Sequence, residues 1–359
     1  MKKINRTVKT VSTVLLVGAV LAGCGNNANN GNTGSSTANS GTSNTASNAV
    51  VSTDTATEAA KVEVTDITQV VNWFPQPEHG GQFAADEKGF YEEAGFENME
   101  ILPGGPQVSS MQIVASGKAQ FGLGIADDIL MARENGLPLV AVASVFQESP
   151  NAIMTHKSAG IDSLDKIEGH NVIIASGSNF WPFIKAKFDF KNITEQTYTG
   201  SLVEFVNDPN SVIQSFSTSE PYVMDQEGVD IELRMVSESG YNPYMNLIFT
   251  TEDFIKENPE TVRQFVAASL KGWDYYKDNF EEINPVLQEG NPDVPLEKMA
   301  FSAEAAMELI YTGDALEHGV GYMSEERWQE LADQLVEVGL LKEGTDVSGA
   351  FTTEFLPQE

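Results

Sequence analysis

Aromatic side chains lie where two of the expected elements begin or end, and such rings can bind a planar ligand. Trp73 ends the first expected strand, and Phe74 and two prolines follow it closely. A ring held rigidly there can stack on a flat ligand, which adds about 0.5–1.5 kcal/mol beyond burial. Trp181, at the start of an expected helix, could form the second wall of an aromatic sandwich. The alternative for Trp73 is packing in the core, and the alternative for Trp181 is packing of its own helix.

Two turns rich in glycine or serine precede expected helices. The first covers residues 103–107 and ends in Gln107, and the second covers residues 176–179, including Ser178 and Asn179. The first N–H groups of a helix have no partner within the helix, so either turn can bind a polar or anionic ligand group. A tight turn without any ligand is the alternative for both.

Two ionisable side chains could set specificity. His79 lies in the loop after the first expected strand and could hydrogen-bond a ring substituent, with a structural histidine as the alternative. Glu220 and Tyr222 lie in the turn-prone stretch 218–222. A carboxylate at Glu220 would pair with donors such as an aminopyrimidine edge and would repel nitrate or sulfonate. The alternative is a solvated surface acid.

No catalytic or metal-binding motif is recognised. The chain has no Gly-x-Ser-x-Gly, no phosphate-binding Gly-Lys-Ser/Thr loop and no His-Glu-x-x-His, and its other histidines lack metal-ligand spacing. Asp127 and Asp128 begin an expected helix, where acids complement the helix dipole, and cleft lining is their alternative role. We therefore expect no catalytic residue, no metal and no cofactor, and we expect that the chain is not an enzyme.

The elements that must position these residues alternate between β-rich runs and amphipathic helical runs. Such alternation predicts an α/β fold with mainly parallel sheets. Strands are expected at residues 64–73, 99–102, 120–125, 139–146, 151–156, 171–175, 231–236 and 246–250. Helices are expected at 82–94, at 126–135, at 163–168, at 180–190 and, in a helical tail, at 258–279, 296–311 and 324–338.

Two α/β series followed by a helical tail indicate two lobes. We expect lobe 1 to comprise residues 61–152 and 247–359, the latter including the C-terminal helices, and lobe 2 to comprise residues 153–246. The chain would cross between the lobes twice. Ligands of such folds bind in the crevice at the carboxyl ends of the strands, so the candidate residues are expected in the inter-lobe cleft.

The N-terminal segment has the pattern of an export signal. Four basic residues precede an apolar stretch at 11–21 that is too short to span a bilayer permanently. It ends in Leu-Ala-Gly-Cys, which looks like a bacterial lipobox and predicts lipidation of Cys24, the only cysteine of the chain. Residues 1–23 are thus expected to be a signal peptide. Residues 24–60, rich in Asn, Gly, Ser and Thr, are expected to be a flexible tether.

The formal net charge of −31 limits the classes of partner. Such an acidic surface repels nucleic acid and anionic lipid headgroups, so we expect neither as a partner. Solubility, or adaptation to salty or alkaline surroundings, is enough to account for the acidity.

Four sequence blocks carry a family resemblance. They are Val-Asn-Trp-Phe-Pro-Gln-Pro-Glu-His-Gly-Gly-Gln-Phe-Ala-Ala at 71–85, Ala-Ser-Gly-Lys-Ala-Gln-Phe-Gly at 115–122, Gly-Leu-Pro-Leu-Val-Ala-Val at 136–142 and Ser-Glu-Pro-Tyr at 219–222. In this order they resemble the thiamine-precursor-binding family, the NMT1/THI5-like group, within the nitrate, sulfonate, taurine and riboflavin binding-protein clan. The resemblance covers roughly residues 64–250.

The resemblance implies a two-lobed periplasmic-binding-protein-like fold of type II that closes over its ligand. It also implies an ABC permease and its ATPase as partners. Some members of the group are enzymes that make the thiamine pyrimidine with a cysteine-rich motif. This chain has only Cys24, so that activity is not carried over.

We therefore expect a lipid-anchored, extracytoplasmic and monomeric binding protein of an ABC importer. Its expected ligand is a small planar heterocycle such as a thiamine pyrimidine precursor, with riboflavin second. A nitrate, sulfonate or taurine binder is the alternative within the same class, and an extracytoplasmic pyrimidine-processing enzyme is the alternative from another class. A purely structural or adhesive lipoprotein would lack a cleft.

Overall fold

The computed structural model describes residues 61–357. They belong to one compact unit, Thr57–Glu359. The expected signal peptide, the expected lipidation site Cys24 and the whole of the expected tether lie outside the described residues. Within them, no helix is both long and apolar enough to cross a membrane.

The first five-stranded sheet defines lobe 1, and a strand from far along the chain lies inside it. Its order is β2-β1-β3-β10-β4. β1 pairs in parallel with β2 and β3, whereas β10 runs antiparallel between β3 and β4. The strands are β1 (Asp66–Val70), β2 (Asn98–Leu102), β3 (Phe121–Ile125), β4 (Leu139–Phe146) and β10 (Met245–Thr251).

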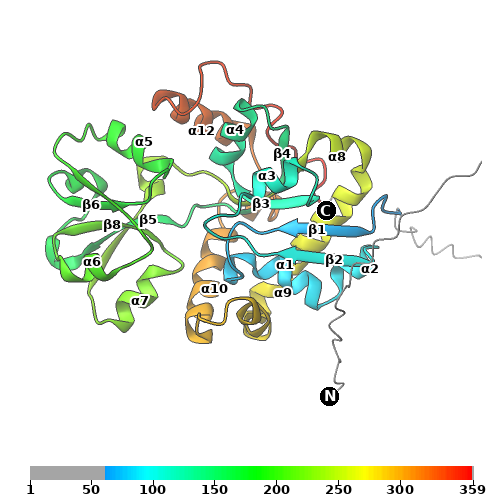
Figure 1. Cartoon of the computed structure of the whole chain (residues 1–359), viewed down its shortest axis with the longest axis horizontal. Coiled ribbons are helices and arrows are strands. Elements are labelled where there is room, and N and C mark those ends of the chain that lie inside the picture. The colour runs from blue at the N-terminus through cyan, green and yellow to red at the C-terminus, as the bar shows by residue number, and fades with distance from the viewer. Residues whose placement is uncertain (1–60, 358–359) are drawn as a thin grey trace, which may run out of the picture. The chain divides into compact units, whose positions relative to one another are not determined.

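The second sheet defines lobe 2 and is built from one contiguous part of the chain. Its order is β7-β6-β8-β5-β9, with β6 parallel to β7 and β8, and β5 antiparallel to β8 and β9. Figure 1 shows this sheet with α5, α6 and α7 around it. The elements are β5 (Asn151–His156), β6 (Asn171–Ile174), α5 (Phe180–Lys187), β7 (Thr194–Thr197), α6 (Val203–Asn207), β8 (Ser211–Phe216), α7 (Glu220–Gln226) and β9 (Ile231–Met235).

Nine α-helices surround the lobe 1 sheet within the described residues. Side chains of Ser109, Thr251 and Ser324 cap three of them by accepting a hydrogen bond from the third following N–H. The helices are α1 (Gly80–Glu87), α2 (Phe90–Glu93), α3 (Ser110–Ala115), α4 (Ala126–Glu134), α8 (Glu252–Glu257), α9 (Pro259–Gly290), α10 (Leu296–Ile310), α11 (Ala315–His318) and α12 (Glu325–Glu337). The short 3₁₀ segments are η1 (Pro77–His79), η2 (Lys157–Ala159), η3 (Leu164–Ile167) and η4 (Val236–Ser239).

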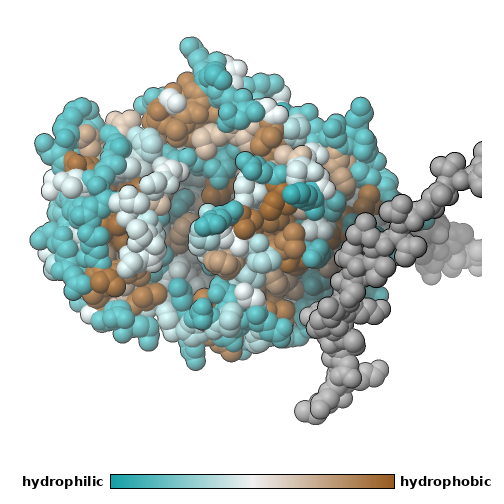
Figure 2. Space-filling view, viewed as in Figure 1, coloured by the Kyte–Doolittle hydropathy of each residue, from teal (hydrophilic) through white to brown (hydrophobic). Residues whose placement is uncertain are grey.

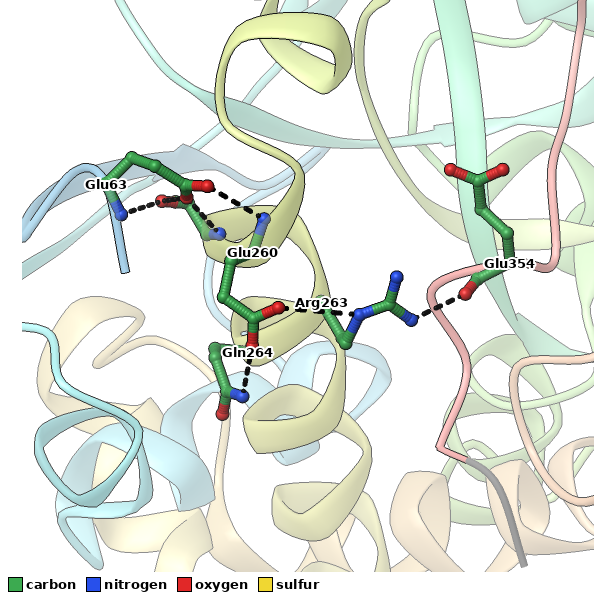
Figure 3. Close-up of polar contacts among 6 residues, drawn as sticks. Glu63, Glu260, Arg263, Gln264 and Glu354 are labelled. Carbon is green, nitrogen blue, oxygen red and sulfur yellow. Dashed lines mark hydrogen bonds and ion pairs between the residues drawn. The ribbon is translucent and has the colours of Figure 1, made fainter. Parts of the chain in front are cut away.

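The start of α9 fixes both ends of the described chain. Figure 3 shows the Glu63 carboxylate accepting hydrogen bonds from the backbone N–H groups of Glu260 and Thr261, at 3.3 and 2.7 Å. A carboxylate there satisfies N–H groups that the helix itself leaves free and interacts favourably with the helix dipole. From the next turn Arg263 donates to the carbonyl oxygen of Glu354 at 2.7 Å.

Glycines let α1 and α9 approach closely. A Cβ on Gly81 would lie 2.3 Å from the Trp273 ring, and a Cβ on Gly272 would lie 2.0 Å from the Gly81 carbonyl oxygen. A Cβ on Gly80 would likewise lie 2.2 Å from the Tyr276 ring. The paired glycines at 80–81 thus have a packing role, because no larger residue fits between the two helices.

One hydrophobic cluster contains side chains from both lobes. α12 packs on α4 of lobe 1 and on α5 of lobe 2. The cluster includes Trp328, Leu331 and Leu335 of α12 together with Phe180 and Phe183 of α5, all of them buried. The C-terminal helix therefore joins the lobes in addition to the two chain crossings.

Arg327 of α12 holds both chain crossings. Its Nη2 donates to the carbonyl oxygens of Gln147 and Asn242, at 2.7 and 3.1 Å, and its guanidinium lies 3.8 Å from the Tyr244 ring. Gln147 lies in the segment 147–150 between β4 and β5, and Asn242 lies in the segment between β9 and β10. Asn242 Oδ1 also accepts the Ser149 N–H at 2.9 Å, so the two crossings are joined directly.

The expected α/β, two-lobed periplasmic-binding-protein-like fold is confirmed. The expectation of mainly parallel sheets is wrong: both sheets are mixed, because β10 in the first and β5 in the second pair antiparallel with both of their neighbours. The helix expected at 180–190 ends earlier, at Lys187, where Asp189 adopts a positive φ of 52°. The helix expected at 258–279 continues beyond a kink at Asn279 to Gly290. The lobe boundaries expected at 152/153 and 246/247 stay predictions; β5 begins at Asn151 and β10 at Met245.

Candidate functional site

The loop after β1 presents an exposed aromatic pair. Trp73 and Phe74 are 42% and 43% exposed, and their rings lie 5.7 Å apart in an edge-to-face arrangement. The other three tryptophans of the chain are buried. Solvent-accessible rings on a short loop that continues through two prolines form a stiff platform for a planar ligand.

The Pro-Gly-Gly-Pro turn after β2 supports this pair from behind. Gly104 donates its N–H to the Trp73 carbonyl oxygen at 2.9 Å, and a Cβ on Gly104 would lie 2.4 Å from the Val71 carbonyl oxygen. Gly105, at φ 150°, lies under the Phe74 ring. Gln107 follows on the same turn and is exposed. This turn therefore backs the aromatic rings, and one of its N–H groups is already used.

His79 is fully buried at the other end of the loop. Its Nε2 lies 2.8 Å from Asn72 Oδ1. Burial lowers the pKa of His79 to about 3, so the ring is neutral at physiological pH. The structure places His79 behind the loop, away from solvent.

Glu78 makes a contact between the lobes that the sequence did not point to. Its carboxylate accepts a hydrogen bond from Thr218 Oγ1, in lobe 2, at 2.6 Å. Burial raises the pKa of Glu78, and the negative charge of Glu220 raises it further, against the opposing hydrogen bond and Lys298. Glu78 therefore resists ionisation unless a donor or a cation approaches it.

Glu220 is the first residue of α7 rather than part of an irregular turn. Its Oε2 accepts the Phe216 N–H at 2.7 Å, and burial raises its pKa. The ring of Tyr222, two residues further on, lies 5.8 Å from the Phe301 ring of lobe 1. Glu220 and Glu78 thus come from opposite lobes and lie within each other's electrostatic reach.

A second group of carboxylates lies at the start of α4. Asp128 Oδ1 accepts from Asn179 Nδ2 of lobe 2 at 3.2 Å, and Asp127 Oδ2 accepts the Tyr241 hydroxyl at 2.7 Å. Burial raises the pKa of both acids, and the charge of Asp127 adds to the effect at Asp128. These two hydrogen bonds and the one between Glu78 and Thr218 therefore share a pattern, with a lobe 1 carboxylate as acceptor and a neutral donor from lobe 2 or the crossing next to it.

The remaining candidates lie beside α5. Ser178 Oγ donates to Gln214 Oε1 at 3.1 Å. Trp181 is 3% exposed, with its ring 6.4 Å from Phe190, so most of it packs within lobe 2. Together with Asn179 these two residues border a hollow of about 300 Å³.

The structure thus brings some of the expected residues to facing sides of the two lobes and separates others from them. Asn179 and Tyr222 of lobe 2 contact lobe 1, and Glu220 lies within electrostatic reach of Glu78. Trp73 and Phe74 are exposed, whereas His79 and Trp181 are buried. In the view of Figure 2 the surface is mostly hydrophilic, with separate hydrophobic patches. Within residues 61–357 no group of three or more acids, histidines or cysteines could hold a metal ion.

Comparisons with known proteins identify relatives along most of the chain. The family model described as NMT1/THI5 like matches residues 76–283. The riboflavin-binding protein RibY of Chloroflexus aurantiacus is 26% identical, over 84% of this chain and 90% of its own. The formylaminopyrimidine-binding protein of Halalkalibacterium halodurans is 23% identical, over 84% and 93%.

Two further comparisons mark the breadth of this group. A 4-amino-5-hydroxymethyl-2-methylpyrimidine phosphate synthase of Legionella pneumophila is 22% identical, over 81% of this chain and 92% of its own. The crystal structure of the periplasmic aliphatic sulphonate binding protein SsuA of Escherichia coli superposes with a TM-score of 0.63 at 13% identity, over 82% and 94%. That structural likeness concerns the fold alone.

Proposed function

Because this chain belongs to the NMT1/THI5-like family, we propose that it is the extracytoplasmic substrate-binding lipoprotein of an ABC importer. Its ligand in this proposal is a small planar heterocycle such as a thiamine pyrimidine precursor. Cys24 would carry the lipid anchor, and a permease with its ATPase would receive the ligand. The relatives named as riboflavin-binding and formylaminopyrimidine-binding proteins support the class of ligand.

The observation that carries the proposal is the exposed Trp73–Phe74 pair on the loop that leads into Glu78, whose carboxylate accepts a hydrogen bond from Thr218 of lobe 2. The rings supply stacking surface, and Glu78 and Glu220 supply acceptors for amino or ring N–H groups. A ligand donor near these acids would also relieve the cost of burying their charge.

The same carboxylates argue against an anionic ligand. Nitrate or sulfonate would meet Glu78, Glu220, Asp127 and Asp128, and Lys298 is the cation that acts on the first two. Each of these groups that is ionised would repel the anion, and a bound anion would raise the pKa of the others further, so its charge is poorly compensated there. An anion binder is therefore the weaker candidate, although SsuA shares the fold.

An enzyme of pyrimidine chemistry is the candidate from another class, because relatives bear that name. The cysteine-rich motif that the resemblance associates with such enzymes has no counterpart here, since Cys24 is the only cysteine. The more similar relatives are named as binding proteins. These two points favour binding without turnover.

A thermal-shift screen of the full chain tests the proposal. The panel contains a formylaminopyrimidine, an aminopyrimidine, thiamine, riboflavin, taurine, an alkanesulfonate and nitrate. A ligand at a hundred times its Kd adds about 2.7 kcal/mol of stability, which is easily detected as a rise in Tm. We expect the Tm to rise with a pyrimidine or a flavin. Trp73→Ala and Glu220→Gln should each raise the Kd of that ligand about tenfold or more.

Matched controls separate binding from general destabilisation. Leu316→Ala removes another exposed apolar side chain of lobe 1, and Glu204→Gln neutralises an exposed acid of lobe 2. Both should leave the shift unchanged. A rise with sulfonate or nitrate alone would contradict the heterocycle assignment, and chemical conversion of a bound pyrimidine would replace the binding protein by an enzyme.

A further inference from the structure

Asn246 has an unusual backbone conformation inside a central strand. It is one of two non-glycine residues with positive φ in the described part of the chain, at 47°, and it is 4% exposed. The pairing of β10 with β3 shifts register between Met245 and Leu247, on either side of it. Such a conformation costs about 1 kcal/mol or more for a residue with a side chain, so it persists where the surroundings require it.

The side chain of Asn246 belongs to a closed chain of hydrogen bonds. Asn246 Nδ2 donates to the Glu78 carbonyl oxygen at 2.6 Å, and Asn246 Oδ1 accepts from Asn72 Nδ2 at 3.1 Å. Asn72 Oδ1 in turn lies 2.8 Å from His79 Nε2. Because Asn72 presents its oxygen there, neutral His79 carries its proton on Nε2 and donates it. Glu78 and His79 are adjacent, which closes the ring.

This hydrogen-bonded ring of Asn246, Asn72, His79 and Glu78 holds both ends of the loop that contains the aromatic pair. Asn72 precedes Trp73, and Glu78 and His79 follow the second proline of the loop. Both ends are thereby fastened to the irregularity in β10, and the two prolines reduce the freedom of the segment between them. Buried side-chain networks hold their members in one arrangement, and in this one only His79 Nδ1 lacks a partner within the described residues.

We propose that Asn246, through Asn72 and His79, is the positioning residue of the ligand site. It fixes the loop so that Trp73 and Phe74 face the ligand while the Glu78 carboxylate faces Thr218 of lobe 2. The ring thereby links the aromatic platform to a contact that forms between the lobes. The assignment of the ligand contact rests on the proposed function, whereas the positioning of the loop does not.

Asn246→Gly separates the effect of the Asn246 side-chain amide from the effect of its backbone conformation. Glycine adopts positive φ without steric cost, so the variant keeps the irregular strand and loses only the hydrogen bonds of the side chain. Asp189→Gly is the matched control, because Asp189 is the other non-glycine residue with positive φ, at 52°, and it lies on lobe 2 outside the site. Asn72→Ala removes two bonds of the same ring without changing β10.

Fluorescence reads out the loop without any ligand. Trp73 is the exposed tryptophan among the four, so acrylamide quenching of the full chain reports mainly on this ring. We expect Asn246→Gly and Asn72→Ala to raise the quenching constant about twofold and to lower the fluorescence anisotropy. The reason is that the indole of Trp73 is more accessible and more mobile when its loop is loosened. Asp189→Gly should match the wild type in both measurements.

Ligand titration gives the second readout, with riboflavin and a formylaminopyrimidine as probes. We expect Asn246→Gly to raise the Kd of the probe that binds about tenfold, and to leave the order of preference among probes unchanged. A folded Asn246→Gly chain with wild-type quenching and Kd would overturn the inference. If the wild type binds neither probe, the proposed ligand class fails, and the quenching comparison alone still decides the positioning role.

Discussion

Asp127 is buried and Asp128 partly buried, and neither forms a salt bridge within the described residues. Their partners are neutral: the hydroxyl of Tyr241 and the amide of Asn179. Burial, and then the charge of Asp127, raises the pKa of Asp128 to about 7, well above that of an unfolded aspartate. The folded protein therefore holds more protons than the unfolded chain between about pH 4 and 7.

The sign of this linkage predicts how stability varies with pH. A carboxyl group with a raised folded pKa contributes stability that is present below its unfolded pKa and is lost as the pH rises through its folded pKa. Asp128→Asn should therefore raise the free energy of unfolding at pH 8 by about 2 kcal/mol and change it little at pH 4. Urea unfolding at both pH values measures this, and the exposed Asp165→Asn is the control. Equal gains at both pH values would contradict the argument.

At the residue scale, sequence reasoning reached the candidates whose signal is local. Trp73 and Phe74 could be selected because an aromatic pair directly follows a β-rich run. Glu78, Thr218 and Asn246 could not be selected, since their roles depend on partners more than a hundred residues away. For Asn246 a weak signal exists, because asparagine tolerates positive φ better than most residues.

At the element scale, the glycine contact between α1 and α9 determines how the start of α1 is placed. Gly272 leaves room for the Gly81 carbonyl oxygen, and Ala85 lies beside both. Since η1 and the aromatic loop lead directly into α1, this contact also helps to fix the position of the aromatic loop. Replacement by any larger residue must push the two helices apart.

Gly272→Ala is accordingly expected to destabilise the fold although alanine is the better helix former. The helix propensity favours alanine by about 1 kcal/mol, but overpacking against the Gly81 backbone should cost about 2–4 kcal/mol, so a net loss is expected. Chemical denaturation should show a lower midpoint. Glu281→Ala, at an exposed position of the same helix, should stay within about 0.5 kcal/mol of the wild type. A midpoint at or above that of the wild type would mean that the helices separate freely.

Strand and helix positions were largely predictable from periodicity, and sheet order was not. The strands expected at 139–146 and 151–156 match β4 and β5. That β10 pairs between β3 and β4 depends on contacts across more than a hundred residues, which no local pattern contains. Glu220 was expected in a turn, but the Pro at the second position of α7 suits the first turn of a helix equally well.

At the scale of the whole molecule, Arg327 holds the two chain crossings together. Its donors reach one carbonyl oxygen on each crossing, and Tyr244 stacks beneath the guanidinium. Motion between lobes of this kind is concentrated in a few residues that absorb changes in φ and ψ. Gly240, at φ 88°, and the segment around Ser149 lie beyond the clamped carbonyl groups on the lobe 2 side.

Loss of the clamp should change the distribution of lobe separations. We expect Arg327→Gln to increase the radius of gyration of the ligand-free chain in small-angle scattering. It should also raise the Kd of the ligand about threefold to tenfold, because less of the protein occupies the binding-competent state. Arg133→Gln is the control: Arg133 also donates to a carbonyl oxygen, at 2.8 Å, but lies wholly within lobe 1. It should lower stability without widening the molecule. Identical scattering for all three proteins would show that Arg327 has no part in lobe motion.

Because lobe 2 is contiguous in the sequence, a protein with this architecture could acquire a new ligand specificity by recombination. Residues from β5 to β9 form one uninterrupted stretch, so recombination at two points can transfer the whole second sheet to another binding protein. The hydrophobic cluster shared by α5 and α12 restricts that exchange. A transplanted lobe arrives with a foreign α5 and must fit a C-terminal helix that it did not bring along. Functional chimeras should therefore require that α12 comes from the same parent as α5.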